Sequence, residues 1–394
     1  MMKLVRFLSR KNKKNWFAVW LNVVVMFGFL VTAAQSYAGE NNADMRAFLE
    51  QMPKAELHLH LEGSLDPQTV SRLANNNDLN FFNSADDVKK SLSNREPGLN
   101  GFLSHYNKAL QVLKTQDDFY NATYELLRIL DQNNIIYVDL FFDPQEHTRR
   151  GISFDEFFNG IDKGRIEGEK AFGIKVNLIM CINRNLSVQS AIEALEQAEN
   201  YKDKIIGFGM DSGPEYGNPP LKFKDVFARA RREGYYLTGH HDVHVQDSVK
   251  HIWQSLDIIK LDRIDHGLDA VNDAELVTAL RERNICLTGS PVKRTSDPEP
   301  QDIDAIRKLD DNGVCVSLHS DDPGQFESGY LSNMMILVQE AGEFSKADMT
   351  RLMLNAFRAL WLSDEEKKSY INKLKTYAAA NTVVWNEVTR TKSK

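Results

Sequence analysis

The chain has 394 residues, of which 42% are hydrophobic, 26% are charged and 10% are aromatic. This composition excludes disordered, collagen-like and disulfide-stapled small proteins, and the length suffices for one large single-core domain or two ordinary ones. The net charge is −7, and because residues 1–38 hold six basic residues and no acid, the remainder carries −13. An acidic body argues against sequence-independent binding to a nucleic-acid polymer.

The first 38 residues have the layout of a secretory signal peptide. A basic run ends at Lys14, an apolar run covers Trp16–Ala34, and a small-x-small pattern, Ser36-Tyr37-Ala38, follows. This order predicts cleavage after Ala38, export to the periplasm or the exterior, and a mature protein that does not bind a membrane. The alternative is an uncleaved inner-membrane anchor, because ~19 apolar residues can span a bilayer. The sequence leaves the oligomeric state open.

The three cysteines do not form a recognisable framework. Cys181, Cys286 and Cys315 include no CxxC pair and allow one disulfide at most. We expect buried free thiols.

From residue 39 onward the sequence predicts a single domain in which strands alternate with helices. Several of the strand-like runs are apolar almost throughout, as in parallel strands that are buried on both faces. Eight strands in a βαβ order predict a closed (β/α)8 TIM barrel over residues 39–394. An open doubly wound sheet is the alternative, but no glycine-rich phosphate loop follows any run. The eight runs are Ala55–Leu61, Ile135–Phe142, Val176–Cys181, Ile205–Met210, Tyr236–His240, Arg263–Gly267, Ile285–Gly289 and Val314–Ser320.

Amphipathic segments supply the predicted helices. Apolar residues recur at helical spacing in Asp117–Gln132 and Phe223–Arg232, and Ser363-Asp-Glu-Glu366 forms a capping box. The polar stretch Asn75–Asn107 is expected to be a helical insertion over the barrel mouth.

Histidine and aspartate residues gather at the predicted carboxyl ends of strands, where barrels carry their active sites. In a strand, His58 and His60 point to the same side and can reach one ion. Together with His240 and Asp321 they offer three imidazoles and one carboxylate, which suits one Zn²⁺ per chain with an open position for water. The ion lowers the pKa of its water toward ~7.

Neighbouring polar residues receive provisional roles. His266 is predicted to orient or stabilise the attacking hydroxide, and Asp322 to face the substrate and hydrogen-bond a ring nitrogen. Glu62 and Ser64 are candidates for further polar contacts, and they could equally be satisfied loop caps.

At this point the chain resembles the adenosine/adenine deaminase family, with the bacterial and fungal adenine deaminases as the nearest branch. The resemblance runs from about residue 46 to about residue 340. It implies a (β/α)8 barrel, one zinc held by the ligands named above, and hydrolysis of an exocyclic amine on a purine nucleoside or base with release of ammonia. The motifs are Met52-Pro-Lys-Ala-Glu-Leu-His-Leu-His-Leu-Glu-Gly-Ser-Leu65, Phe141-Phe-Asp-Pro-Gln145, Gly217-Asn-Pro-Pro220, Arg263-Ile-Asp-His-Gly267 and Ser317-Leu-His-Ser-Asp-Asp-Pro323.

The fifth strand departs from the family pattern. The family has His-Ala-Gly-Glu there, and its Glu protonates the ring, whereas this chain has Val243 at the Glu position. Three readings stand: Asp242 or His244 transfers the proton, the substrate is another aminated heterocycle such as a pterin, or the protein binds purines without catalysis. A second ion held by His241, Asp242 and His244 is a further hypothesis.

Two other departures concern the predicted pocket. Lys293 and Arg294 follow the seventh strand, where they would favour an anionic substrate group or lie on a solvated turn. The loop after the fourth strand has one residue more than the family pattern, so Glu215 is predicted to contact substrate in an uncertain register. A zinc hydrolase of another bond, such as a lactam or ester, is the remaining rival.

Overall fold

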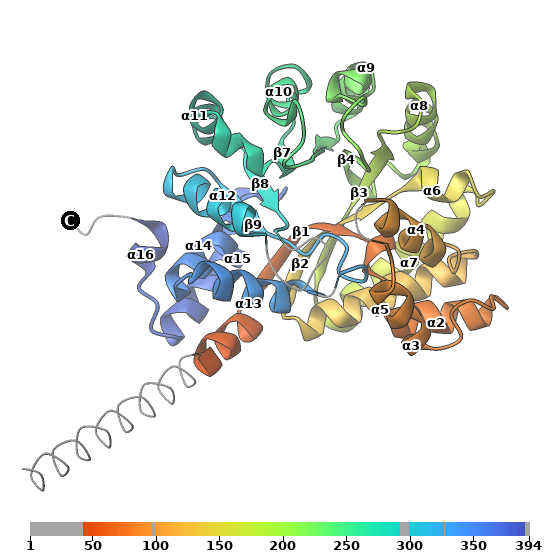
Figure 1. The fold of residues 1–394 in the computed structure, drawn as a ribbon, viewed down its shortest axis with the longest axis horizontal. Helices are drawn as coiled ribbons and strands as arrows, with labels where there is room; N and C mark the ends of the chain where they lie inside the picture. Colours follow the sequence, from red (N-terminus) through yellow and green to blue (C-terminus); the bar gives the residue numbers. More distant parts are fainter. Residues whose placement is uncertain (1–41, 97–98, 292–298, 327, 391–394) are drawn as a thin grey trace, which may run out of the picture. The chain divides into compact units, whose positions relative to one another are not determined.

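The computed structural model describes residues 42–96, 99–291, 299–326 and 328–390 (Figure 1). The chain divides into two units, residues 1–49 and residues 50–394. Of the first unit the structure describes residues 42–49, which are helical. The signal peptide predicted over 1–38 and the cations Lys293 and Arg294 lie outside the described residues. Within the described ranges, no helix combines the length and the apolar character that crossing a bilayer requires.

In the second unit, parallel strands form two hydrogen-bonded sheets. The first has the order β1-β2-β3-β4-β5 and the second the order β6-β7-β8-β9. The strands are β1 (Lys54–His60), β2 (Ile135–Phe142), β3 (Lys175–Asn183), β4 (Ile205–Asp211), β5 (Tyr236–Leu237), β6 (His240–His241), β7 (Arg263–His266), β8 (Cys286–Gly289) and β9 (Val316–Leu318).

Backbone hydrogen bonds join the two sheets at both edges, which closes the barrel. On one side, Leu59 forms a parallel bridge with Asp321, and the Asp321 amide donates to the His58 carbonyl at 3.0 Å. On the other, the Asp262 amide, next to β7, donates to the carbonyl of Leu237 on β5 at 2.8 Å. The fifth predicted strand is divided into β5 and β6. The eight predicted strand positions of the barrel are therefore occupied by nine strands in the described residues. The predicted TIM-barrel fold is confirmed.

Helices follow the strands on the outside of the sheets, as Figure 1 shows for α8 to α12. The described α-helices are α2 (Pro67–Asn76), α3 (Ala85–Ser93), α4 (Leu99–Leu110), α5 (Gln116–Gln132), α6 (Pro144–Thr148), α7 (Phe154–Phe172), α8 (Val188–Gln197), α9 (Lys224–Arg232), α10 (Ser248–Gln254), α11 (Ala274–Glu282), α12 (Pro300–Asp311), α13 (Leu331–Gly342), α14 (Lys346–Arg358), α15 (Asp364–Ala380) and α16 (Trp385–Thr389). Short 3-10 or π turns are η1 (Glu62–Ser64), η2 (Ala198–Tyr201), η3 (Pro220–Phe223), η4 (Ser255–Ile259) and η5 (Leu268–Asn272).

The predicted helices are found with small shifts in their ends. The Ser363 side chain accepts from the Glu366 amide, and the Glu366 side chain bonds back to the Ser363 amide, so the expected capping box opens α15. The polar insertion is helical, since it contains α3 and α4, and α4 contributes side chains to the cavity described below.

The expectation of free thiols is wrong for two of the three cysteines. Cys286 on β8 and Cys315, next to β9, form a disulfide. No sequence pattern indicated this pairing, because the two residues are 29 positions apart and meet only when β8 and β9 lie side by side. Cys181 is a buried free thiol, as expected.

Candidate active site

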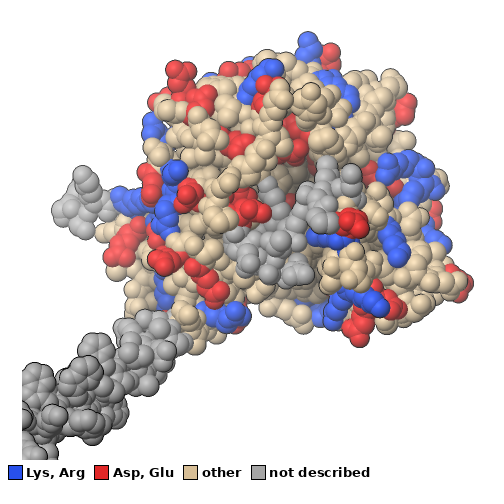
Figure 2. All heavy atoms as spheres, viewed as in Figure 1, with Lys and Arg blue, Asp and Glu red and all other residues tan. Residues whose placement is uncertain are grey.

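A cavity of about 540 Å³ lies where the carboxyl ends of the strands meet. One wall comes from α4 and the loop after β9, with Phe102, Leu103, Tyr106 and Phe326. Figure 2 shows acidic side chains around the hollow in the face drawn, while Lys and Arg lie mostly toward its edges. Residues at or just beyond the strand ends that line the cavity are His60, Asp143, Asn183, Asp211, His240, His266, Asp321 and Asp322.

The four predicted metal ligands converge at one end of this cavity. His240 Nε2 lies 2.9 Å from His58 Nε2 and 3.0 Å from His60 Nε2. Asp321 Oδ1 lies 3.3 Å from His58 Nε2 and 3.4 Å from His60 Nε2. All four residues are buried. The structure therefore brings together the three imidazoles and the carboxylate that the sequence pointed to.

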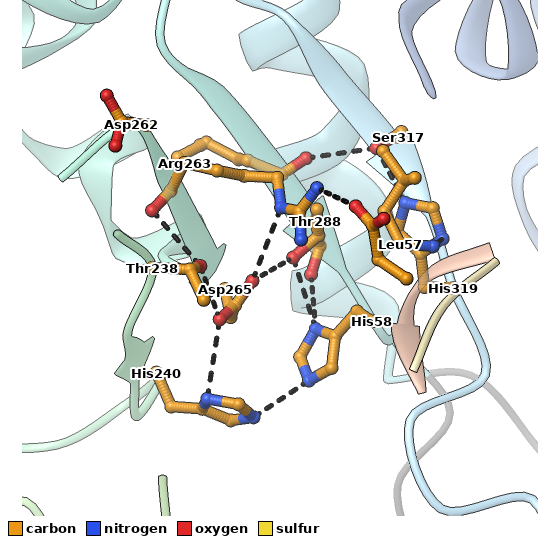
Figure 3. A network of polar contacts seen from close by, with 12 residues as sticks. Leu57, His58, Thr238, His240, Asp262, Arg263, Asp265, Thr288, Ser317 and His319 are labelled. Carbon is orange, nitrogen blue, oxygen red and sulfur yellow. Dashed lines mark hydrogen bonds and ion pairs between the residues drawn. The ribbon is translucent and has the colours of Figure 1, made fainter. Parts of the chain in front are cut away.

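Hydrogen bonds on the far side of the rings fix which nitrogens face the cluster, as Figure 3 shows for His58 and Thr288. His58 Nδ1 lies 3.0 Å from the Thr288 carbonyl oxygen, and His240 Nδ1 lies 3.1 Å from the Met210 carbonyl oxygen. Because a carbonyl can only accept, each Nδ1 carries a proton, and each ring turns its Nε2 toward the cluster. Lone pairs that face each other at 2.9 Å require a cation or a proton between them, so this donor set fits a metal ion.

Electrostatics keep His240 in the form that binds a metal. Burial, and then the charges of His58, His60 and His266, lower the pKa of His240 well below its usual value. A neutral imidazole is the metal-binding state.

Asp265 lies behind two of these histidines, on the side of the rings away from the cluster. Its carboxylate accepts from the hydroxyls of Thr238 at 2.6 Å and Thr288 at 2.8 Å (Figure 3). One of its oxygens lies 3.5 Å from His240 Nδ1, and Thr288 Oγ1 lies 3.2 Å from His58 Nδ1. Carboxylates and hydroxyls behind ligating histidines orient the rings.

His266 lies beside the cluster, as its predicted role requires. Its Nε2 is 3.7 Å from Asp321 Oδ2, and its ring centroid is 4.6 Å from that of His58. His266 and Asp321 both have positive φ, at 56° and 64°. Strained backbone of this kind persists where surrounding structure enforces it, and it is concentrated at functional sites.

Asp322 and Glu62 have different environments. Asp322 lines the cavity, and its buried Oδ1 has no hydrogen-bond partner. Burial, and then the charges of Asp321, Asp211 and Glu62, raise the pKa of Asp322 well above its usual value.

Glu62 does not line the cavity among the described residues. Its Oε1 lies 2.7 Å from His147 Nε2 and accepts from the Asp143 amide at 3.1 Å. Burial alone would raise the pKa of Glu62, but the hydrogen bond and charge of His147 outweigh burial and lower it. Ser64 donates to the His60 carbonyl at 2.5 Å, which is the contact of a loop cap.

The residues after His240 point in different directions. Asp242 and Val243 line the cavity. His244 does not, because its Nε2 lies 2.8 Å from Asp302 Oδ1 and its amide donates to Asp269 at 2.8 Å. The structure thus places Asp242, but not His244, on the cavity wall. The hypothetical second ion has no support, since His241, Asp242 and His244 do not appear together in any metal-compatible group of the described residues.

Glu215 is placed behind the cavity instead of in it. Its Oε1 lies 2.9 Å from His241 Nδ1 and 3.3 Å from His251 Nδ1, and the fully buried Arg184 is 3.4 Å away. Its amide donates to Asp242 Oδ2 at 2.9 Å, and its Oε2 accepts from the Asp242 amide at 3.1 Å. Glu215 therefore holds the Asp242 carboxylate in place.

Two cavity residues, Asp143 and Asp211, and the buried Arg184 behind them were missed in the sequence. Asp143 and Asp211 lie directly after or at the ends of β2 and β4, so the strand-end signal that singled out the other site residues also applied to them. Arg184 donates from Nε to the Asp211 carbonyl at 3.2 Å and from Nη2 to the His240 carbonyl. No sequence signal marked Arg184, because its role depends on three strands that meet only in the fold.

Comparison with known proteins decides the family. Residues 53–377 match the adenosine deaminase family model. An adenine deaminase from Crocosphaera subtropica is 38% identical over 82% of this chain and 98% of its own length. The chain belongs to the adenosine deaminase family. This adenosine deaminase family member is thus a deaminase-type aminohydrolase, as the sequence predicted.

Other relatives agree with this assignment. An uncharacterized deaminase from Schizosaccharomyces pombe is 38% identical over 86% of this chain and 99% of its own length. Among solved structures, an adenine deaminase from Arthrobacter aurescens superposes with a TM-score of 0.76 at 27% identity, over 83% of this chain and 99% of that one. An amidohydrolase from Burkholderia ambifaria, solved with bound Zn, gives 0.76 at 25% identity, over 86% and 95%.

Proposed function

We propose that this protein uses one Zn²⁺ per chain to hydrolyse the exocyclic amine of a purine-like base or nucleoside. The observation that carries the proposal is the convergence of three imidazole nitrogens and one carboxylate at the inner end of the cavity. The curated relatives named adenine deaminase, and the zinc in the Burkholderia amidohydrolase, support it.

His58, His60, His240 and Asp321 would hold the ion. When bound, Zn²⁺ would act as a Lewis acid that lowers the pKa of water toward neutrality. His266, whose Nε2 is 3.7 Å from Asp321, would donate a hydrogen bond to the oxygen that adds to the ring. Asp322 would position the ring through its unpartnered Oδ1, which a ring N–H can satisfy.

The reaction consumes one water for each amine released. The water oxygen forms a bond to the ring carbon that bears the amine, and the bond between that carbon and the amine nitrogen breaks. The two water protons are distributed so that the ring becomes a lactam and the amine leaves as ammonia. At least one side chain must hold a proton near the ring during this exchange.

Asp242 is the residue that we assign to this proton transfer. Val243 cannot carry a proton, and His244 is bound to Asp302 away from the cavity. Asp242 lines the cavity, and Glu215 fixes its Oδ2 at 2.9 Å. An Asp242→Asn variant keeps this shape and loses the proton-carrying group, so we expect ammonia release to fall about 10²–10⁴-fold.

The experiment measures zinc content and ammonia release from a panel of purines, nucleosides and pterins. We expect about one zinc per chain, loss of that zinc in His58→Ala, and retained zinc with lost activity in Asp242→Asn. Asp86→Asn, an exposed helix residue, is the matched control. Ammonia release that Asp242→Asn leaves unchanged would remove Asp242 from the mechanism.

Val243 favours one second candidate, a purine-binding protein without catalysis. Its mark would be zinc-loaded protein that binds purines by calorimetry and releases no ammonia from any member of the panel. A hydrolase of lactams or esters would instead release a carboxylic acid from lactam or ester substrates. It would leave the amines of the purine panel intact.

We also propose export to the periplasm or exterior. The proposal rests on the basic, apolar and small-residue order of residues 1–38, and the Cys286–Cys315 disulfide is the kind of bond that oxidising compartments sustain. Fractionation of expressing bacteria and the N-terminal mass of the protein test it. A mature chain that starts at Gly39 supports cleavage, while an intact N-terminus in the membrane fraction supports the anchor.

A further inference from the structure

A group of charged side chains lies buried inside the barrel, behind the histidine cluster. Arg263 and Asp265 are two residues apart on β7, so both side chains point to the same side of the strand, and they are only 1% and 0% exposed. Arg263 Nη1 donates to Asp139 Oδ2 at 2.7 Å, and Asp139 belongs to β2 in the other sheet. Barrel interiors are usually filled with branched apolar residues, and burying charges carries a large desolvation cost. Packing alone therefore does not explain these three charges.

Arg263 is held by two contacts that leave Asp265 accessible to other donors. Asp139 accepts from one end of the guanidinium, and the Trp361 ring covers it with its centroid 4.2 Å from Arg263 Cζ. Arg263 Nε lies 3.9 Å from Asp265 Oδ1, which is an ion pair and too long for a hydrogen bond. Arg263 therefore acts as a counter-charge to Asp265 without using its oxygens.

The Asp265 oxygens are directed toward two of the predicted metal ligands (Figure 3). The Thr288 hydroxyl donates to Asp265 Oδ1 at 2.8 Å, because the carboxylate can only accept. The Thr288 oxygen is then free to accept from His58 Nδ1, which lies 3.2 Å away. Asp265 Oδ2 accepts from the Thr238 hydroxyl at 2.6 Å and lies 3.5 Å from His240 Nδ1. One carboxylate therefore acts on both rings, through Thr288 on His58 and directly on His240.

We propose that Asp265 is a positioning residue of the metal centre and that the buried Arg263 is its counter-charge. This inference rests on the proposed zinc site, and it holds whether or not the bound ion serves deamination. Asp265 fixes the direction of two of the three imidazoles at once, so the ligands are arranged before an ion enters. Its negative charge also strengthens both Nε2 atoms as electron donors. Loss of such a partner lowers the affinity of a metal site about 10- to 100-fold.

The test measures zinc affinity by competition with a chelator of known affinity. We expect Asp265→Asn to weaken zinc binding roughly 10- to 100-fold. Asp139→Asn is the matched control, since it removes an equally buried carboxylate whose partners are Arg263, Tyr137 and Asn177 instead of the histidines. It should leave zinc affinity nearly unchanged while it lowers the free energy of unfolding, because the guanidinium loses an acidic partner.

Cobalt gives a readout that a loss of stability alone does not move. Co²⁺ can replace zinc in sites of nitrogen and oxygen ligands, and its visible absorption bands depend on the geometry of those ligands. Asp265→Asn should shift the bands of the cobalt-loaded protein. Asp139→Asn should lower Tm and leave the bands in place.

Thr288 provides a second pair of variants in case Asp265→Asn does not fold. Thr288→Val removes the hydroxyl between Asp265 and His58, and it should weaken zinc binding roughly 2- to 10-fold, the effect of one hydrogen bond. Thr288→Ser keeps the hydroxyl and should bind zinc as the unaltered protein does. Full affinity in Thr288→Val would overturn the role of Asp265 toward His58.

Two further results would overturn the positioning role. One is an Asp265→Asn variant that binds zinc as tightly as the unaltered protein, with unchanged cobalt bands. The other is an equal loss of affinity in Asp139→Asn, since the effect would then come from buried charge in general.

Ammonia release separates this inference from the proposed function. Zinc binding that depends on Asp265, without ammonia release from any purine, sinks only the deaminase. Ammonia release by a zinc protein whose affinity does not depend on Asp265 sinks only the positioning role. An unaltered protein that binds no zinc would contradict both.

Discussion

Gly63 shows how one missing side chain shapes the site. A Cβ at this position would lie 1.6 Å from Asp322 Oδ1 and 2.4 Å from its Cγ. The Asp322 carboxylate therefore occupies the space where any other residue would place its side chain. The backbone at Gly63 is not in the left-handed region, so room for Asp322 is the reason that glycine fits here.

We expect Gly63→Ala to displace Asp322 and leave the metal ligands in place. Zinc content should stay near one per chain, while KM for the substrate rises because Asp322 no longer positions the ring. Steady-state kinetics and metal analysis measure the two effects. Gly289→Ala is the control, since its Cβ would meet nothing closer than 3.4 Å. Unchanged kinetics in Gly63→Ala would mean that Asp322 does not contact substrate.

Arg184 is the buried charge on which the loops behind the cavity depend. It is fully buried, contacts Glu215 at 3.4 Å and donates to the carbonyls of Asp211 and His240. Arg184→Met removes a buried partner of Glu215 and leaves the carbonyls of Asp211 and His240 without their donor, so we expect the free energy of unfolding to fall by about 3–5 kcal/mol.

Urea unfolding measures this change. Arg283→Met, which breaks an exposed pair with Asp257, should cost less than about 1 kcal/mol. Adding Glu215→Gln to Arg184→Met should restore part of the lost free energy of unfolding. A double variant that is less stable than either single variant would contradict the pairing of Arg184 with Glu215.

At the scale of elements, the disulfide ties β8 to the start of β9. Replacing Cys286 and Cys315 by alanine should lower the free energy of unfolding by about 2–4 kcal/mol, because the cross-link restricts the unfolded chain. Urea unfolding with and without a reductant checks this. The unaltered protein should lose stability on reduction and the double variant should not respond. A response in the double variant would have to come from Cys181, the remaining thiol.

The elements were predictable where burial is two-sided. β2 and β4 have nearly continuous apolar runs, so both strands were located from the sequence. The division of the fifth strand into β5 and β6 was not predicted, because it depends on the hydrogen bonds that Thr238 and Gly239 form with neighbouring strands. The convergence of His58, His60, His240 and Asp321 was predictable because the carboxyl ends of the barrel strands meet at one edge. The side-chain directions of His244 and Glu215 were not predictable. They depend on contacts between loops, of His244 with Asp302 and of Glu215 with His241.

At the scale of the whole molecule, the metal should act as a stabiliser. Removing the ion leaves inward-facing lone pairs in a buried cluster, so we expect chelation to lower Tm. At a free zinc concentration a thousandfold above Kd, the bound ion contributes about 4 kcal/mol. Calorimetry with and without a chelator measures the shift, and His58→Ala should be insensitive to the chelator. A stripped protein with an unchanged Tm would contradict this.

The pairing of β1 with Asp321 has a consequence for the order in which the site is synthesised and folded. Two imidazoles of the centre are synthesised early, whereas the aspartate is synthesised about two thirds of the chain later. A nascent or truncated polypeptide therefore cannot assemble the complete binding pocket, however well its first strands pair. The complete set of proposed metal ligands therefore forms only after the chain has been synthesised through Asp321 and this residue has paired with β1.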